Sequence, residues 1–200
     1  MKKPEAELWE AKKELRRRML AARRALSESE RASCSRQIAV RLLSLPEVRD
    51  AHCVFAYAAM PDEVRTEELL TQLLSEGRRV AIPLVTGERK MEAVELTSTE
   101  ALERGAYGIL TVKEGAGRIL PPKEIDCALV PGVAFSPKGD RLGMGGGFYD
   151  AFLPRMRKDA ARIAPAFSCQ IAESIPCLPE DEGVDVVVTE RDLYETYMRL

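Results

Sequence analysis

Hydrophobic residues in the first 45 positions recur at the spacing of two consecutive helices. In residues 5–26, apolar side chains return every three or four positions, which is the period of an amphipathic helix. Ser27 and Glu30 form a capping-box pattern that begins a second helix, and Pro46 ends it. We therefore predict an N-terminal helical pair over about residues 5–45 that packs on the rest of the protein.

Beyond residue 52 the hydrophobic pattern changes to short apolar runs that alternate with helical segments. Strands are predicted at residues 53–58, 78–85, 91–96, 125–135, 162–167 and 184–190, and helices at residues 66–77 and 148–156. The rest of residues 86–124 is richer in Gly, Glu and Pro, and we expect an irregular excursion there. This alternation predicts a three-layer α/β fold, with a largely parallel sheet and helices on both faces, in one domain over residues 1–200.

The composition is that of an ordinary globular protein. Hydrophobic residues make up 46% of the 200 positions, charged residues make up 31%, and the formal net charge is −2. An overall charge near zero gives no reason to expect a nucleic-acid-binding protein. The chain has no apolar run of about 18 residues and no signal-peptide core, so we expect a cytoplasmic location and no membrane contact.

The cysteines and the histidine limit the chemistry that the protein can perform. The five cysteines are odd in number and contain no C-x-x-C pair, which argues against a disulfide framework and a zinc site. They are Cys34, Cys53, Cys127, Cys169 and Cys177. His52 is the only histidine, and nothing near it in the sequence suggests a catalytic nucleophile. We therefore expect chemistry based on carboxylates, cations, backbone amides and a metal ion.

The segment RLGMGGGFYD, residues 141–150, contains four of the 13 glycines and lies between a predicted strand and a predicted helix. Ordering glycine costs conformational entropy, so either a turn with positive φ or close approach of backbone N–H groups to a phosphate explains the cluster. The segment is no Walker A loop, since no Lys-Ser/Thr follows the glycines, and Phe148 breaks a G-x-G-x-x-G pattern. Ligands bind at the carboxyl ends of strands in open α/β sheets, which favours a binding site here.

Three segments stand in the order found in one enzyme family. They are KKELRRRMLAARRAL, VFAYAAMPDEVRTEEL, and the glycine segment with VD near the C-terminus. On these segments the chain resembles the 5-formyltetrahydrofolate cyclo-ligases. The resemblance implies a fold of the sugar-phosphate isomerase and CoA-transferase type. It also implies cyclisation of 5-formyltetrahydrofolate to 5,10-methenyltetrahydrofolate with ATP and Mg²⁺, releasing ADP and phosphate, without a nucleic-acid or obligate protein partner.

The resemblance also assigns residues to the site. The implied ATP-binding residues are Lys12, Arg16, Arg141, Leu142, Gly143, Met144, Gly145, Gly146, Gly147, Phe148 and Tyr149. The implied substrate-binding residues are Ala58, Glu63, Met144, Gly145, Gly146, Gly147 and Phe148. Asp150 and Asp185 are the implied magnesium ligands, and Arg141 and Tyr149 are expected to act in catalysis. Arg141 would neutralise charge as the phosphoryl group moves.

The residues themselves fit these roles, with two departures from the family pattern. Lys12, Arg16 and Arg23 share one face of the first helix, beside its apolar stripe, and can present cations to a triphosphate. Phosphoryl transfer needs positioning and charge neutralisation more than a protein nucleophile, which agrees with the scarcity of histidine. Phe148 stands where many members have Tyr, and Ser136 stands where Asp is usual.

Two other functions remain open from the sequence. A fold does not fix a function, so a sugar-phosphate isomerase or CoA-transferase-like enzyme that uses no ATP is one alternative. The other is a binding module whose basic N-terminal helix contacts RNA or an acidic partner. The near-neutral charge and the lack of separated aromatic stacking residues argue against this module.

Overall fold

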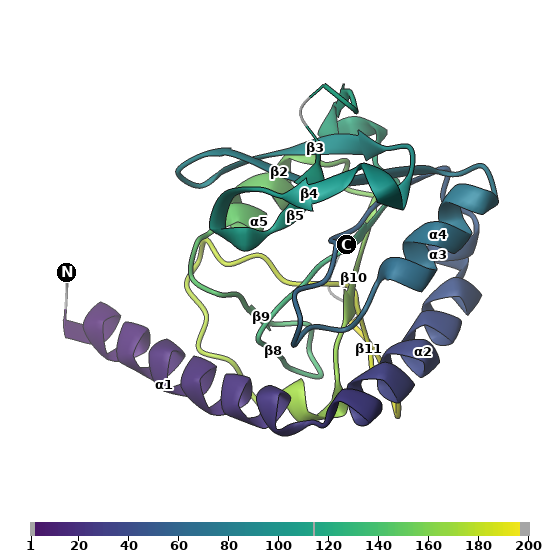
Figure 1. The fold of residues 1–200 in the computed structure, drawn as a ribbon. Helices are drawn as coiled ribbons and strands as arrows, with labels where there is room; N and C mark the ends of the chain where they lie inside the picture. The colour runs from purple at the N-terminus through teal and green to yellow at the C-terminus, as the bar shows by residue number, and fades with distance from the viewer. Residues whose placement is uncertain (1–2, 114, 197–200) are drawn as a thin grey trace.

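An eight-stranded mixed sheet forms the centre of the computed structural model, which describes residues 3–113 and 115–196 (Figure 1). The strand order is β12-β11-β10-β7-β1-β2-β3-β6. These strands are β1 (Cys53–Phe55), β2 (Arg79–Gly87), β3 (Lys90–Leu96), β6 (Ile119–Leu120), β7 (Cys127–Leu129), β10 (Ala161–Pro165), β11 (Val186–Val188) and β12 (Leu193–Glu195). The contiguous strands from β11 to β2 pair in parallel, whereas β12 and β3 pair antiparallel with their neighbours, so the predicted largely parallel sheet is confirmed.

The α-helices are α1 (Lys3–Ala25), α2 (Glu28–Ser44), α3 (Pro46–Arg49), α4 (Glu67–Ser75) and α5 (Phe148–Phe152). The break between α1 and α2 is the predicted capping box. The Ser27 hydroxyl accepts a hydrogen bond from the Glu30 backbone N–H at 3.2 Å, and the Ser27 N–H donates to the Glu30 carboxylate at 2.7 Å. The predicted helical pair is therefore present, with its boundary fixed by local chemistry.

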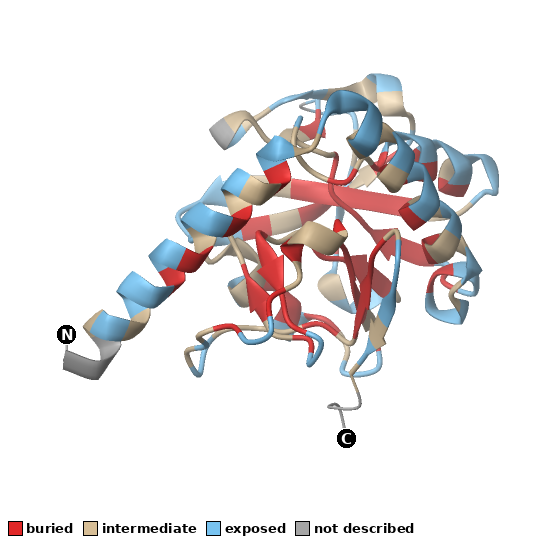
Figure 2. Ribbon diagram, turned by 90° about the horizontal axis from the view of Figure 1, so that it is seen from below, coloured by how far each residue is buried: buried red, intermediate tan, exposed pale blue. Residues whose placement is uncertain are grey.

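Side chains of a strand alternate between the two faces of the sheet. Both faces are apolar here, and helices cover each of them. Val54 and Ile82 belong to a core cluster with residues of α2, α3 and α4. Phe55 points to the other face, where its ring lies 4.7 Å from that of Phe152 in α5, measured between centroids. Figure 2 shows the buried strands between these outer elements. The three-layer arrangement predicted from the sequence is confirmed.

Helix α1 packs apart from the sheet faces and borders the candidate site. Leu15 and Met19 join a small apolar cluster with residues of β8 (Ala134–Phe135) and β9 (Arg141–Leu142). The first turns of α1 extend away from the sheet (Figure 1). One face of the helix therefore rests on the ribbon that leads into the glycine segment.

Three predictions about the elements are wrong. Residues 125–135 are not one long strand: β7 and β8 belong to different sheets, because Pro131 and Gly132 interrupt the run. Residues 86–124 are more regular than expected, since besides β3 they contain β6 and the hairpin of β4 (Leu102–Arg104) and β5 (Leu110–Val112). The expected helix at residues 148–156 is α5 followed by a 3-10 turn that contains Pro154.

Short 3-10 helices complete the described chain. They are η1 (Thr99–Ala101), η2 (Ala106–Gly108), η3 (Pro122–Glu124), η4 (Leu153–Arg155) and η5 (Ser168–Gln170).

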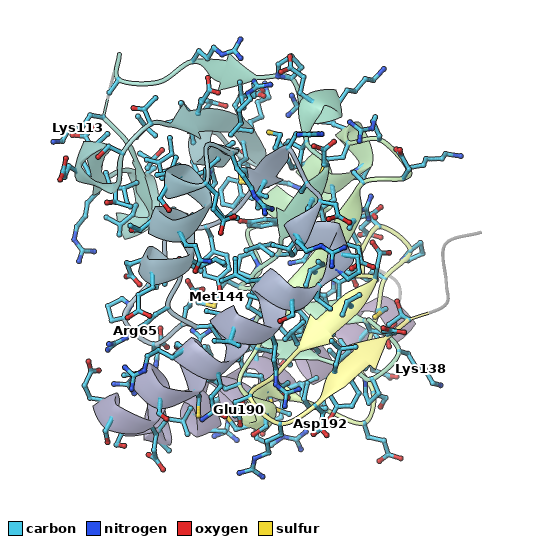
Figure 3. The ribbon with its side chains drawn as sticks, turned by 90° about the vertical axis from the view of Figure 1, so that its right-hand side faces the viewer. Arg65, Lys113, Lys138, Met144, Glu190 and Asp192 are labelled. Atoms are coloured by element: carbon cyan, nitrogen blue, oxygen red, sulfur yellow. The ribbon has the colours of Figure 1, made fainter. Side chains whose placement is uncertain are left out.

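Charges of both signs are mixed over the surface. Arg65, Lys138 and Asp192, which are labelled in Figure 3, are examples of the two signs. Among residues 3–113 and 115–196, no helix is long and apolar enough to cross a membrane.

Candidate functional site

A cavity of about 730 Å³ lies between α1, the segment after β1, the β2–β3 hairpin and the glycine segment. It gathers every site residue expected from the sequence except Asp185: Lys12, Arg16, Ala58, Glu63 and the ten residues 141–150 line it. These residues are far apart in the sequence, so a fold that unites them in one hollow supports the predicted site. His52, in contrast, is not among the residues that line this cavity.

The glycine segment forms a loop whose turns require glycine. Gly145 has φ of 100° and Gly147 has φ of 66°, both in the left-handed region that favours glycine. A Cβ on Gly146 would lie 2.7 Å from the Phe148 ring. In the described part of the chain, the backbone N–H groups of Gly145 and Gly146 have no hydrogen-bond acceptor. Turn geometry thus explains why glycines stand here, and unpaired N–H groups remain for a ligand.

Two of the α1 cations that line the cavity, Lys12 and Arg16, are held by distant parts of the chain. The Lys12 side chain is 5% exposed, and its ammonium group pairs with the Asp181 carboxylate. The Arg16 Nε–H donates to the Gly143 carbonyl at 2.8 Å, and burial lowers the pKa of Arg16. Arg17, in contrast, is 73% exposed and, among the described residues, pairs only with Glu14. The predicted cationic face therefore borders the glycine loop, while its neighbour on the helix faces solvent.

Buried Arg141 and half-buried Asp150 form an ion pair at the two ends of the glycine segment. Arg141 is 3% exposed, and its guanidinium donates to the Asp150 carboxylate and, at 3.1 Å, to the Glu182 carbonyl. The Glu182 backbone N–H also donates to Asp150 Oδ1 at 3.1 Å. Because the carboxylate is held from two sides, Arg141 orients Asp150 as well as lining the cavity itself.

The two expected magnesium ligands occupy different positions. Asp150 lines the cavity next to the glycine loop, where a carboxylate oxygen and phosphate oxygens together suit a hard cation. Asp185 is not among the lining residues, and its carboxylate accepts a hydrogen bond from the Arg162 backbone N–H at 2.7 Å. No group of three or more His, Cys, Asp or Glu residues that could hold a metal occurs within the described ranges. Asp150 therefore fits a metal shared with phosphates, and the role of Asp185 stays a prediction.

The other end of the cavity combines buried polar groups with apolar walls. Glu63 accepts a hydrogen bond from the Met60 backbone N–H at 3.0 Å, and burial raises the pKa of its carboxyl group. Ala58 is buried in the wall, where it forms a β-bridge with Leu110. The Tyr149 hydroxyl is buried without a hydrogen-bond partner in residues 3–113 and 115–196, and burial raises its pKa. This end can enclose a largely apolar ligand and offer it a few polar contacts.

Ser136 fixes the turn that leads into the glycine loop. Its hydroxyl donates to the Asp140 carboxylate at 2.7 Å and accepts from the backbone N–H groups of Lys138 and Asp140 at 3.2 and 3.1 Å. The serine therefore pins this turn by itself, although the family pattern usually has Asp there.

Several lining residues were missed by reasoning from the sequence. They include Trp9, Tyr57, Arg89 and Asp181. Asp181 stands in an acidic loop, and no local pattern relates it to Lys12. Arg89 follows Gly87 in a turn-like segment between two predicted strands, so a hairpin tip could have been inferred, but not which surface it covers. Arg23, which shares the basic face of α1, does line the cavity and pairs with Asp62 at 3.0 Å.

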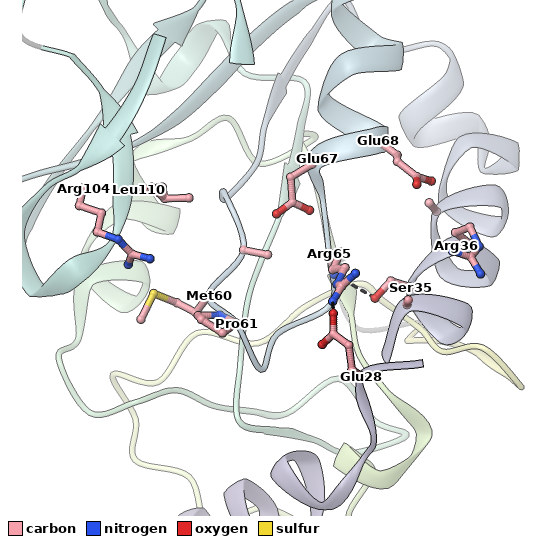
Figure 4. A pocket seen from close by; sticks show the side chains of 13 residues that line it. Glu28, Ser35, Arg36, Met60, Pro61, Arg65, Glu67, Glu68, Arg104 and Leu110 are labelled. Atoms are coloured by element: carbon pink, nitrogen blue, oxygen red, sulfur yellow. Dashed lines mark hydrogen bonds and ion pairs between the residues drawn. The ribbon is translucent and has the colours of Figure 1, made fainter. Parts of the chain in front are cut away.

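A second cavity, of about 560 Å³, lies between α2, the start of α4 and the β4–β5 hairpin (Figure 4). Arg65 pairs there with Glu28, and its backbone N–H donates to Ser35. None of the residues expected at the site lines this cavity, although Met60 borders both. The candidate site is therefore the larger cavity.

Comparison with known proteins decides the family. The profile of the 5-formyltetrahydrofolate cyclo-ligase family matches residues 9–190. The chain belongs to the 5-formyltetrahydrofolate cyclo-ligase family. The 5-formyltetrahydrofolate cyclo-ligase of Escherichia coli (strain K12) is 30% identical over 176 residues, which cover 86% of this chain and 97% of that protein. The Mus musculus 5-formyltetrahydrofolate cyclo-ligase is 30% identical over 190 residues, covering 90% of this chain and 94% of that protein.

A solved structure agrees with the family assignment. The NMR structure of Aquifex aeolicus 5,10-methenyltetrahydrofolate synthetase superposes with a TM-score of 0.82 at 34% identity, covering 93% of each chain. The resemblance noted in the sequence and the predicted α/β fold with its N-terminal helices are thereby confirmed. As a member of the 5-formyltetrahydrofolate cyclo-ligase family, the chain belongs to a family of ligases.

Proposed function

We propose that the protein catalyses the ATP-dependent cyclisation of 5-formyltetrahydrofolate to 5,10-methenyltetrahydrofolate, with release of ADP and phosphate. The observation that carries this proposal is the single cavity in which the α1 cations, the glycine loop, Asp150 and Glu63 meet. A phosphate-binding end and an apolar end in one hollow suit a phosphoryl transfer between a nucleotide and a ring-bearing substrate.

In the proposed reaction, the formyl oxygen bonds to the terminal phosphorus of ATP while the bond to ADP breaks. The nitrogen at position ten then attacks the formyl carbon and loses its proton to solvent, and phosphate leaves with that oxygen. Both steps need positioning and charge neutralisation rather than a protein nucleophile. The cysteines agree with this, because burial raises the pKa of Cys53 and of Cys177 to about 11 and keeps them as thiols at neutral pH.

The chain's own groups divide into two sets by position. Lys12 and Arg16 border the part of the cavity formed by α1, where they would neutralise the nucleotide phosphates. The N–H groups of the glycine loop would donate hydrogen bonds to phosphate oxygens next to Arg16. Arg141 holds Asp150 in place, and a magnesium ion bound there would neutralise phosphate charge.

At the other end of the cavity, Glu63 and the Tyr149 hydroxyl would contact the folate. The raised pKa of Glu63 favours its neutral form, which can donate a hydrogen bond as well as accept one. The Tyr149 hydroxyl has the same capacity and lacks a protein partner in the described residues. Ala58, buried in the wall, would contact the substrate through backbone and packing.

The absorbance of the methenyl product tests the proposal directly. Protein is incubated with 5-formyltetrahydrofolate and Mg²⁺, with and without ATP, and ADP formation is measured in parallel. We expect absorbance to rise only with ATP, with one ADP for each methenyl product. Substrate consumption that proceeds equally well without ATP would contradict the proposal and favour the ATP-independent alternative.

A further inference from the structure

Arg89 is a cation at the glycine loop that comes from an element outside the family's recognisable segments. It stands at the tip of the β2–β3 hairpin and lines the main cavity. A Cβ on Gly147 would lie 2.9 Å from Arg89 Nε and 3.2 Å from its Cζ. The Arg89 guanidinium therefore rests directly on Gly147, in space that any other residue at position 147 would fill.

The backbone of the hairpin is shaped to bring Arg89 there. The β2–β3 register shifts between Val85 and Gly87, and Arg89 has φ of 52°, which among the described residues is the only positive φ outside glycine. An arginine in the left-handed region costs conformational energy, and such residues gather at functional sites. Arg155 anchors the start of β3 by donating to the Met91 carbonyl at 3.0 Å. A strained tip on an anchored strand fixes the direction in which Arg89 extends.

Arg89 also differs from the other cations of the loop in its partners. Arg16 donates to the Gly143 carbonyl, and Arg141 is held by Asp150. The Arg89 guanidinium has no hydrogen bond or ion pair to any residue in the two described ranges. Its charge is therefore available to an anion without breaking an existing interaction.

The position of Arg89 determines which phosphate group of the nucleotide it can contact. The loop has Arg16 beside Gly145, on the side of α1, and Arg89 beside Gly147, on the side of the β2–β3 hairpin. With the nucleotide on the α1 side and the folate near Glu63, the transferred group passes between these ends. We propose that Arg89 binds the terminal phosphate of the nucleotide and neutralises its charge during transfer, which makes it a catalytic residue. This inference rests on the proposed function.

The test compares Arg89→Gly, Arg89→Lys and the control Lys90→Gln. Glycine accepts the left-handed backbone, so Arg89→Gly removes the charge while the melting temperature stays the same or rises. Lys90 is exposed on the same hairpin and is not among the residues that line the cavity. Trp9, the only tryptophan, lines the cavity, so its fluorescence can report binding of ADP and of a non-hydrolysable ATP analogue.

We expect Arg89→Gly to weaken binding of the ATP analogue about tenfold and to change ADP binding less than about twofold. Its kcat/KM for ATP should fall about tenfold or more, equal to about 1.4 kcal/mol in the barrier. Arg89→Lys should restore part of the affinity for the ATP analogue and part of kcat/KM for ATP, and Lys90→Gln should match the wild type in both. An unchanged ratio of ATP-analogue to ADP affinity in Arg89→Gly would overturn the inference. If wild-type protein shows no ATP-dependent turnover, the proposed function is wrong, and the affinity ratio still decides the role of Arg89.

Discussion

Tyr149 carries a hydroxyl group that the protein encloses without giving it a partner among the described residues. The Tyr57 hydroxyl, also buried and in the same cavity wall, donates to the Val64 carbonyl at 3.2 Å and so has the kind of partner that Tyr149 lacks. A buried polar group that makes no hydrogen bond costs about 1–3 kcal/mol of stability. A buried hydroxyl that is kept at this cost is typical of a group that forms its hydrogen bond with a ligand.

We predict that Tyr149→Phe leaves the ligand-free protein as stable as the wild type, or about 1 kcal/mol more stable, because it removes an unpaired buried hydroxyl. The same change should lower kcat/KM for 5-formyltetrahydrofolate about tenfold, since one hydrogen bond to the ligand is lost. Thermal melting and steady-state kinetics measure both effects. Tyr194→Phe is the matched control, because that residue lies outside the cavity lining, and it should leave kinetics unchanged. Equal kinetics of the two variants would show that the Tyr149 hydroxyl does not contact substrate.

At the scale of single residues, the sequence predicts the site residues that belong to a recognisable segment and misses the site residues that do not. Lys12, Glu63 and Asp150 were expected at the site because the surrounding motifs place them there. Asp181 pairs with Lys12 across 169 positions, and nothing local to either residue encodes that contact. Arg89 reaches Gly147 only because a hairpin folds over α5. Tertiary contacts of this kind follow from the whole chain and not from spacing.

Among the elements, α1 joins the core and the site most directly. Its apolar face rests on the β8–β9 ribbon through Leu15 and Met19, and Arg16 on an adjacent face bonds to Gly143. The regular spacing of apolar residues made this helix predictable. The interruption between β7 and β8 was not predicted, because the apolar run continues on both sides of Pro131 and its period does not reveal a change of sheet.

We predict that Arg16→Ala weakens MgATP binding and lowers kcat/KM for ATP about tenfold. The melting temperature should change little, because the Arg16 guanidinium contacts the glycine loop and not the apolar core. Arg16→Lys should recover only part of the loss, since a point charge replaces a planar fork. Arg17→Ala is the control on the same helix, because Arg17 is exposed and pairs with Glu14 instead of reaching the cavity. Titration with ATP measures the difference. If Arg16→Ala and Arg17→Ala bind ATP equally, the basic face of α1 is only solvated surface.

For the whole molecule, a ligand in the cavity should bridge elements that are distant in the sequence. The cavity is bordered by α1, the β2–β3 hairpin, the glycine loop and the segment around Asp181. A ligand that binds only the folded state stabilises it by about 2.7 kcal/mol at a concentration of 100 times its Kd.

We therefore predict that saturating MgATP or 5-formyltetrahydrofolate raises the melting temperature by about 5–10 °C, given about 2–4 °C per kcal/mol for a chain of this size. An RNA oligonucleotide should produce no shift, because the surface mixes charges of both signs. Differential scanning fluorimetry measures all three ligands side by side. A shift with RNA and none with MgATP would favour the binding-module alternative.

The contacts that hold α1 in place also determine at what stage of synthesis and folding the candidate site can form. Lys12 pairs with a residue 169 positions later, and Arg16 bonds to one 127 positions later. Contacts between such distant positions carry a large loop-closure cost and form late in folding. On the ribosome, α1 emerges before Asp181 and cannot complete its side of the cavity until that residue has been synthesised. Nucleotide binding at this site thus requires that synthesis has passed Asp181, and a product truncated before that residue lacks part of the wall of the candidate site.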